Sequence, residues 1–147
     1  MSRDQQMKRL LDNGYELDDS LDRIDVDALV TFLSTEAYWG RWRARADIVD
    51  QLRSAWRVVA AYRDGAMTAF ARAVSDGVAF AYLADVYVEP AHRGHGLGVA
   101  VVGELVEGGN GAGFRWLLHT ADAHGLYAKF GFAAPDATVM ERPAAPR

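Results

Sequence analysis

A basic, glycine-rich turn is the part of the chain best suited to hold a charged ligand. It lies in residues 88–100, which read VEPAHRGHGLGVA. Gly94, Gly96 and Gly98 let backbone N–H groups approach a ligand closely, because glycine has no side chain in the way. Arg93 adds positive charge, and the apolar run that follows predicts a helix whose N-terminus attracts anions. The turn therefore predicts a phosphate or pyrophosphate site; the alternative is a surface loop whose glycines serve only the turn.

Two other phosphate-binding motifs fit this turn poorly. The dinucleotide fingerprint requires G-x-G-x-x-G within a parallel βαβ unit near the start of the chain, whereas the glycines here alternate. The P-loop requires Lys followed by Ser or Thr after its last glycine, and this chain has Val99 and Ala100 there. The pattern therefore favours neither class of nucleotide-binding protein.

A few titratable side chains are candidates for proton transfer. Asp85 stands in the apolar run FAYLADVYV, where an ionised carboxylate needs a partner, hydration or a function. It is a candidate general base, and the alternative is a carboxylate satisfied by a nearby arginine or by backbone at a bulge. His119, Asp122 and His124 cluster near Tyr127, so either histidine could relay a proton through water, while Asp122 could instead cap a helix. Their spacing matches no common metal-binding motif, so no metal is expected.

Aromatic and basic residues alternate in the segment AYWGRWRAR, residues 37–45. The aromatic residues Tyr38, Trp39 and Trp42, with the arginines Arg41, Arg43 and Arg45, are candidates to hold a small ligand that has an apolar body and a carboxylate or phosphate. The alternative is that Trp39 packs this segment onto a sheet and the arginines are solvated.

The elements that must position these residues mix strands and helices. Apolar residues at helical spacing predict four helices: over 26–36, over 47–56, from the glycine turn to Gly108 and from 122 to Gly131. A marginal helix is expected before residue 15. Apolar runs bounded by turn residues predict strands over 15–18, 56–62, 68–74, 78–88, 114–121 and 138–142. The second, third and fourth of these should form an antiparallel meander, which gives a mixed α/β (α+β) fold class.

The composition bounds the class of protein. A chain of 147 residues with 50% hydrophobic and 24% charged residues predicts one domain over residues 1–147. The net charge of −4 disfavours nucleic acid, including tRNA, and an anionic membrane as partners. Because the chain has no cysteine, its chemistry must use oxygen and nitrogen groups. The polar start and the absence of a long apolar run predict a cytoplasmic protein.

The glycine turn resembles the acyl-CoA pyrophosphate signature of the GNAT acyltransferase superfamily, V-x-P-x-x-R-G-x-G-x-G. The residues that carry it are Val88, Pro90, Arg93, Gly94, Gly96 and Gly98. A second motif of that family, A-x-x-x-Y-x-x-x-G-F, is carried downstream by Ala123, Tyr127, Gly131 and Phe132. The two motifs stand in the family's order, and the resemblance covers about residues 56–142.

The resemblance implies a GNAT-like fold: a central, mostly antiparallel sheet, flanked by helices, in which one parallel strand pair splays apart. Acetyl-CoA would bind in this splay, with its pantetheine arm along strand 78–88 and the strand 114–121 on the other side. The residues implied to contact it are Val86, Val88, Arg93, Gly94, His95, Gly96, Leu97, Gly98 and Val99.

The resemblance also implies catalytic roles. Tyr127 would be the general acid near the CoA sulfur, and backbone N–H groups near Val86 would polarise the thioester carbonyl. The alternative for Tyr127 is a ring that only fills the core. Many family members carry an asparagine shortly before the alanine of the second motif, whereas this chain has Thr120 and Asp122 in that region, so this contact to the pantetheine arm is not carried over.

The function expected from the resemblance is N-acetyltransferase, by direct transfer from acetyl-CoA to a primary amine of a small molecule or peptide. An alkyl amine has a pKa of ~10.4 and a thiol one of ~8.5, so both proton transfers need help at neutral pH. Tyr127, Asp85 and His124 are the candidates for that help. The alternative is a non-catalytic acyl-CoA-binding or sensing module, which needs neither Tyr127 nor a base. The sequence does not determine which amine is the acceptor. It is also compatible with a homodimer.

Overall fold

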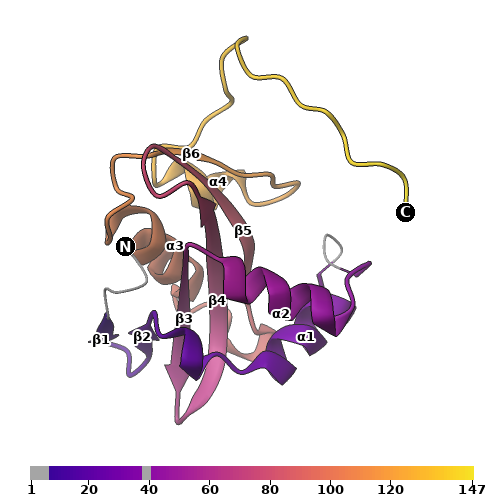
Figure 1. Ribbon diagram of the computed structural model, residues 1–147. Coiled ribbons are helices and arrows are strands. Elements are labelled where there is room, and N and C mark those ends of the chain that lie inside the picture. The colour runs from indigo at the N-terminus through magenta and orange to yellow at the C-terminus, as the bar shows by residue number, and fades with distance from the viewer. Residues whose placement is uncertain (1–6, 38–40) are drawn as a thin grey trace.

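Six strands form one mixed sheet in the computed structural model, which describes residues 7–37 and 41–147 (Figure 1). The strands neighbour one another in chain order: β1 (Lys8–Leu10), β2 (Glu16–Asp18), β3 (Arg57–Arg63), β4 (Ala66–Ser75), β5 (Phe80–Val88) and β6 (Arg115–Leu117). Neighbours from β1 to β5 are antiparallel, and β5 and β6 are parallel. The predicted meander and the mixed α/β fold class are confirmed.

Helices cover both faces of this sheet (Figure 1). They are α1 (Val26–Thr35), α2 (Arg45–Ser54), α3 (Leu97–Glu107) and α4 (His124–Ala128), with short 3-10 helices η2 (Leu21–Arg23) and η3 (Pro90–His92). None of the helices in the described part of the chain is long and apolar enough to cross a membrane.

Two hydrophobic cores lie on opposite faces, because successive residues of a strand point to opposite sides. On one face α1 and α2 bury Leu29, Phe32 and Leu52 against Val58 and Phe70 of the sheet. On the other face the core contains Leu97, Val101, Val102 and Leu105 of α3 together with Val59 and Leu83. The sheet therefore separates α1 and α2 from α3.

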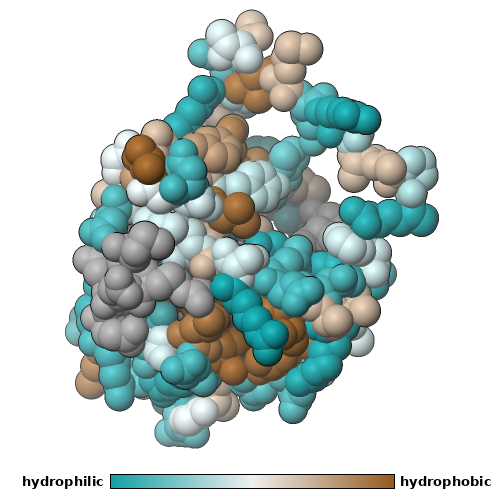
Figure 2. All heavy atoms as spheres, in the orientation of Figure 1, coloured by the Kyte–Doolittle hydropathy of each residue, from teal (hydrophilic) through white to brown (hydrophobic). Residues whose placement is uncertain are grey.

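Two predicted elements are wrong. The segment before residue 15 forms strand β1 and not a helix, because a turn with Gly14 at φ +86° folds it back onto β2. Residues 138–142 form no strand: they are exposed, so they bury no apolar face that would hold them against the free edge of β6. Residues 133–147 are exposed and arch away from the body of the molecule (Figures 1 and 2).

A β-bulge in β5 reverses the direction of one side chain. Phe70 pairs with Tyr87 and Arg72 pairs with Ala84, so β5 holds one residue more than β4 in this interval. Asp85 sits there with φ +55°, a left-handed conformation that is unusual for a residue other than glycine. Without the bulge, Asp85 would share the α3 face with Leu83; with it, the carboxylate lies on the α2 face beside Arg72.

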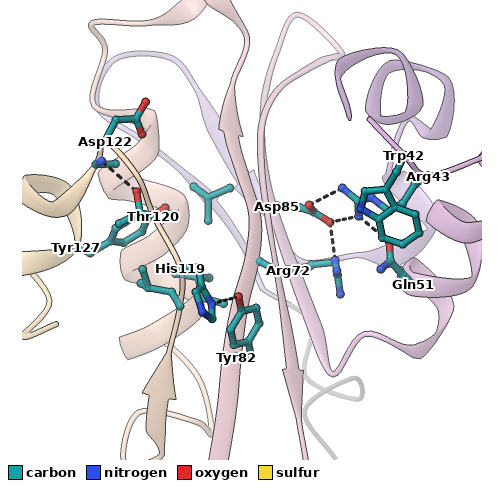
Figure 3. A pocket seen from close by; sticks show the side chains of 15 residues that line it. Trp42, Arg43, Gln51, Arg72, Tyr82, Asp85, His119, Thr120, Asp122 and Tyr127 are labelled. Carbon is teal, nitrogen blue, oxygen red and sulfur yellow. Dashed lines mark hydrogen bonds and ion pairs between the residues drawn. The ribbon is translucent and has the colours of Figure 1, made fainter. Parts of the chain in front are cut away.

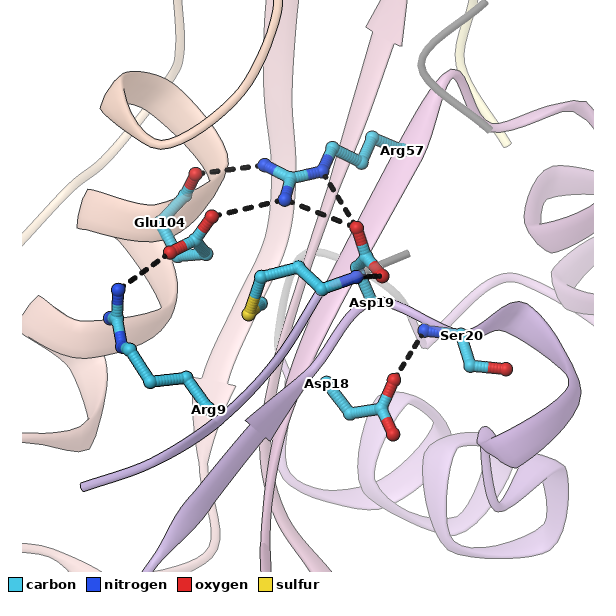
Figure 4. Close-up of polar contacts among 7 residues, drawn as sticks. Arg9, Asp18, Asp19, Ser20, Arg57 and Glu104 are labelled. Atoms are coloured by element: carbon cyan, nitrogen blue, oxygen red, sulfur yellow. Dashed lines mark hydrogen bonds and ion pairs between the residues drawn. The ribbon is translucent and has the colours of Figure 1, made fainter. Parts of the chain in front are cut away.

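A buried ion network joins β2, β3 and α3 (Figure 4). Arg57 donates to the Asp19 carboxylate (Nη2 to Oδ2, 3.2 Å), to the Glu104 carboxylate (3.1 Å) and to the Glu104 carbonyl (2.8 Å). Gly108 and Gly109, which follow α3, leave room for this contact: a Cβ on Gly108 would lie 2.3 Å from Glu104 Oε2, and one on Gly109 2.9 Å from Arg57 Nη1. These glycines therefore allow the close approach of the end of α3 to the ion network.

Candidate active site

Strands β5 and β6 separate along their length and leave a cavity of about 450 Å³ (Figure 3). They pair only where Phe80–Tyr82 meet Arg115–Leu117, so no β5 residue from Leu83 onward has a β6 partner. The cavity wall takes side chains from the α1–α2 link and α2, from β4 and β5, and from the chain between β6 and α4. The predicted splay of a parallel pair is confirmed.

The glycine turn lies between the end of β5 and the first turn of α3. Gly94 and Gly96 have φ values of +86° and +74°, which glycine adopts without strain, and a Cβ on either would meet no atom within 4 Å. Gly96 is the N-cap of α3, where no side chain caps the helix and no acidic residue occupies its first turn. The first N–H groups of α3 therefore lack an intrahelical acceptor, and the turn is open to an anion.

The hairpin of β1 and β2 supports this turn from the side. Asn13 donates from Nδ2 to the carbonyl of His95 (3.0 Å), and the Tyr15 hydroxyl lies 2.8 Å from His92 Nδ1. The Tyr15 ring also contacts the rings of both histidines. The turn is therefore held by contacts across 77 and 82 residues of sequence, which local patterns do not reveal.

Asp85 is paired with two arginines at the α2-facing end of the cavity (Figure 3). Arg43 donates two hydrogen bonds to the Asp85 carboxylate, from Nη1 to Oδ2 and from Nη2 to Oδ1, both at 2.8 Å. Arg72 donates a third, from Nε to Oδ2 at 2.8 Å. Burial by itself raises the pKa of Asp85, but hydrogen bonds and charge from Arg43 and Arg72 outweigh it and hold this pKa below its usual value. The geometry corresponds to the alternative in which arginine satisfies this carboxylate, and it weakens Asp85 as a proton acceptor.

A chain of three polar side chains lies at the β6 side of the cavity. The Tyr82 hydroxyl is 2.6 Å from His119 Nδ1, and His119 Nε2 is 3.0 Å from Glu141 Oε2. Because a carboxylate only accepts, Nε2 carries the proton when the imidazole is neutral, and Nδ1 then accepts from the Tyr82 hydroxyl. Burial raises the pKa of Tyr82, with the charge of Arg72 opposing it, so the hydroxyl keeps its proton at neutral pH.

Tyr127 lies in the cavity wall, and the second sequence motif explains how it is held there. Gly131, at φ +84°, donates to the Ala128 carbonyl (3.1 Å), and Phe132 N–H reaches the Tyr127 carbonyl (3.3 Å). This is a Schellman ending of α4, in which the residue after the glycine packs on the residue five before it. The Phe132 ring accordingly meets the Tyr127 ring edge-on, at 6.0 Å between centroids.

The structure brings together some of the predicted site residues. Tyr127, Asp85 and Val86 all line the cavity, as do His119 and Trp42. His124 is exposed at the start of α4 and is not among the lining residues. Val88 lies beside the glycine turn at Gly98, Leu97 is buried in the α3 core, and Val99 is exposed. Tyr38 and Trp39 lie outside the described residues.

Other lining residues were not singled out as site residues by the sequence. Gln51, Arg72 and Tyr82 carry no motif, and only their contacts across the fold identify them, whereas Arg43 belongs to the arginines of residues 37–45 that the sequence offered for ligand binding. The described residues contain no group of three or more histidine, aspartate or glutamate side chains placed to hold a metal ion.

Comparison with known proteins shows which of them share sequence or fold with this chain. The family model "Acetyltransferase (GNAT) family" matches residues 25–132. A solved structure from Xanthomonas campestris pv. campestris, of a protein assigned to the GNAT family, is 32% identical with a TM-score of 0.83, covering 88% of this chain and 93% of that one. A predicted acetyltransferase from Clostridium acetobutylicum, solved with acetyl-CoA, shares the fold at 16% identity and a TM-score of 0.65, covering 87% and 96%.

One curated relative matches over a shorter stretch. Serotonin N-acetyltransferase 2, chloroplastic, of Oryza sativa subsp. japonica is 45% identical over 76 residues, which are 50% of this chain. The match spans 38% of the length of that relative.

Proposed function

The chain belongs to the GNAT family of acetyltransferases, and on that premise we propose that it transfers an acetyl group from acetyl-CoA to a primary amine of a small molecule or peptide. The observation that carries the proposal is the cavity in the β5–β6 splay, which has Tyr127 in its wall. The open α3 N-terminus follows the end of β5, and Gly98 in its first turn faces Leu126, the neighbour of Tyr127. The reaction forms a C–N bond and breaks a C–S bond, while the amine loses a proton and the departing sulfur gains one.

The residues at the glycine turn fit the pyrophosphate of acetyl-CoA. The first N–H groups of α3 have no cap, Gly94 and Gly96 leave their backbone open, and Arg93 is exposed beside them. A pyrophosphate would meet N–H donors, helix charge and a guanidinium together. When bound, acetyl-CoA supplies the activated acetyl group as a thioester.

Two groups of the chain act on the thioester end in this proposal. Backbone N–H groups of β5 near Val86, on the edge that β6 leaves uncovered, polarise the carbonyl. Tyr127, buried in the cavity wall, donates a proton to the departing sulfur.

In this proposal the acceptor amine loses its proton to the hydrogen-bonded side chains of Tyr82, His119 and Glu141. His119 Nδ1 takes up the proton that the Tyr82 hydroxyl passes on, and Glu141 stabilises the charged imidazole through Nε2. We assign this role to His119 because it lines the cavity, whereas His124 is exposed and does not line it. Asp85 then acts by holding Arg43 and Arg72 in position.

Calorimetric titration with acetyl-CoA tests the proposal, with NAD and ATP as controls at the same salt concentration. Micromolar binding of acetyl-CoA alone is expected, followed by release of free thiol when amines are supplied. Preference for NAD or ATP would refute the proposed cofactor. Binding of acetyl-CoA without transfer to any amine would instead fit a sensing module.

Replacing Arg93 by glutamate should weaken acetyl-CoA binding at least tenfold, because a charge that meets the pyrophosphate is reversed. Arg53→Glu is the matched control: it makes the same change of net charge at an exposed site on α2, across the sheet from α3. Calorimetry measures the Kd of acetyl-CoA for both variants and so tests this prediction. Equal Kd values for Arg93→Glu and the parent would remove Arg93 from the site.

Replacing His119 by glutamine should lower kcat/KM about 10- to 100-fold at pH 7, since the relay loses its proton acceptor. The deficit should narrow as the pH approaches the pKa of the acceptor amine, ~10.4 for an alkyl amine, because less deprotonation is then needed. His124→Gln should change kcat/KM less than threefold. A larger loss in His124→Gln than in His119→Gln would transfer the role to His124.

A further inference from the structure

Positive charge exceeds negative charge at the α2-facing end of the cavity. Among the described residues that line this end, Arg43 and Arg72 share the single carboxylate of Asp85. The three side chains are only 3%, 10% and 5% exposed. The other carboxylate of the lining, Asp122, lies on the α4 side and is exposed (Figure 3). Arg72 thus shares its carboxylate with a second arginine in a shielded place, so an anion beside Arg72 would be stabilised at this end of the cavity.

Arg72 has the donors that such an anion would use. A guanidinium carries five N–H donors, and Arg72 commits only Nε, to Asp85. Its two Nη groups have no hydrogen-bond partner among the described residues, although the side chain is nine-tenths buried in the cavity wall. In Figure 3 a further nitrogen of Arg72 points away from Asp85. The pair of Nη groups forms a fork that matches the two oxygens of a carboxylate.

On the basis of the proposed function, we infer that the acceptor is an amine that also bears a carboxylate, as an amino acid does, and that Arg72 binds this carboxylate. A monoanion balances the one excess positive charge, whereas a phosphate dianion would leave an excess of negative charge. The Tyr82 ring and the half-exposed Trp42 ring add apolar surface to the same cavity, which suits an aromatic side chain on the acceptor. Arg72 thereby determines specificity, and the amine reacts at the relay of Tyr82 and His119.

Paired amines that differ only in the carboxylate test this inference. Phenylalanine against phenethylamine and tryptophan against tryptamine are compared by thiol release, each corrected for its fraction of neutral amine. The carboxylate-bearing member should have a kcat/KM at least tenfold higher with the parent protein. In Arg72→Met this preference should fall to about threefold or less, mainly through KM, and Arg72→Lys should restore part of it.

Arg45→Met is the matched control, because Arg45 is an exposed arginine at the start of α2 that pairs with Asp27. It should keep the full preference. Thermal melting of all variants identifies any that fail to fold, and Arg72→Lys keeps the charge that Asp85 requires.

The outcomes separate the inference from the proposed function. If the parent prefers the amines without a carboxylate, or if Arg72→Met slows both members of each pair equally, the inference is wrong while the acetyltransferase proposal stands. If acetyl-CoA binds but no amine of either kind is acetylated, the proposed function fails and the inference fails with it.

Discussion

Replacing Tyr127 by phenylalanine should lower kcat by about 10²- to 10⁴-fold, the usual contribution of a positioned general acid. The leaving sulfur has a pKa of ~8.5, so at pH 7 its departure benefits from a proton. Acetyl-CoA affinity should change less than threefold, because the ring that packs on Phe132 is retained. Steady-state kinetics from pH 6 to 9.5 should show the deficit narrowing above pH 8.5, where the thiolate leaves unprotonated.

Tyr87→Phe provides the matched control for the loss of a hydroxyl. Tyr87 lies in the α1–α2 core, stacked on Phe32 at 3.9 Å, and its buried hydroxyl has no hydrogen-bond partner within residues 7–37 and 41–147. Removing it should leave kcat unchanged and stability equal or higher, since an unsatisfied buried polar group is lost. A kcat of Tyr127→Phe equal to that of the parent at every pH would reduce Tyr127 to a packing residue.

The parts of the site that the sequence predicts are those encoded by neighbouring residues. Gly94 and Gly96 are needed for positive φ in the turn, and Gly131 is needed for the same reason at the end of α4. Each requirement arises within a few residues of backbone, so it appears as a spaced motif. The splay was predicted through these motifs, and the sheet order and the parallel pairing of β5 with β6 confirm it.

The acceptor end of the cavity depends on contacts that no local pattern records. Asp85 meets Arg43 across 42 residues and Arg72 across 13, and the bulge that turns it toward them has no sequence signature. His119 meets Glu141 across 22 residues, and Glu141 lies in residues 138–142, for which the sequence predicted a strand. Periodicity reports which face of an element is apolar, but not which distant segment lies opposite it.

The largest effect on stability is expected at Arg57. Arg57→Met should lower the free energy of unfolding by about 3–5 kcal/mol, because Asp19 and Glu104 then stay buried without the guanidinium between them. Their side chains are 1% and 4% exposed, so water cannot replace the lost partner. Arg9→Met removes the other arginine of Glu104, but Arg9 is 54% exposed, and an exposed partner of this kind contributes about 1 kcal/mol or less.

Urea denaturation followed by circular dichroism measures the free energy of unfolding of both variants. Similar losses of stability in Arg57→Met and Arg9→Met would contradict the prediction. The two variants also separate stability from function. Arg57 holds α3 at Glu104, two turns beyond the Gly96 N-cap, and does not line the cavity. Below its melting temperature, Arg57→Met should therefore bind acetyl-CoA with a Kd within threefold of the parent, whereas Arg93→Glu should lose binding without losing stability. The ion network thus stabilises the C-terminal end of α3, while the N-terminal end of the same helix stays open to the ligand.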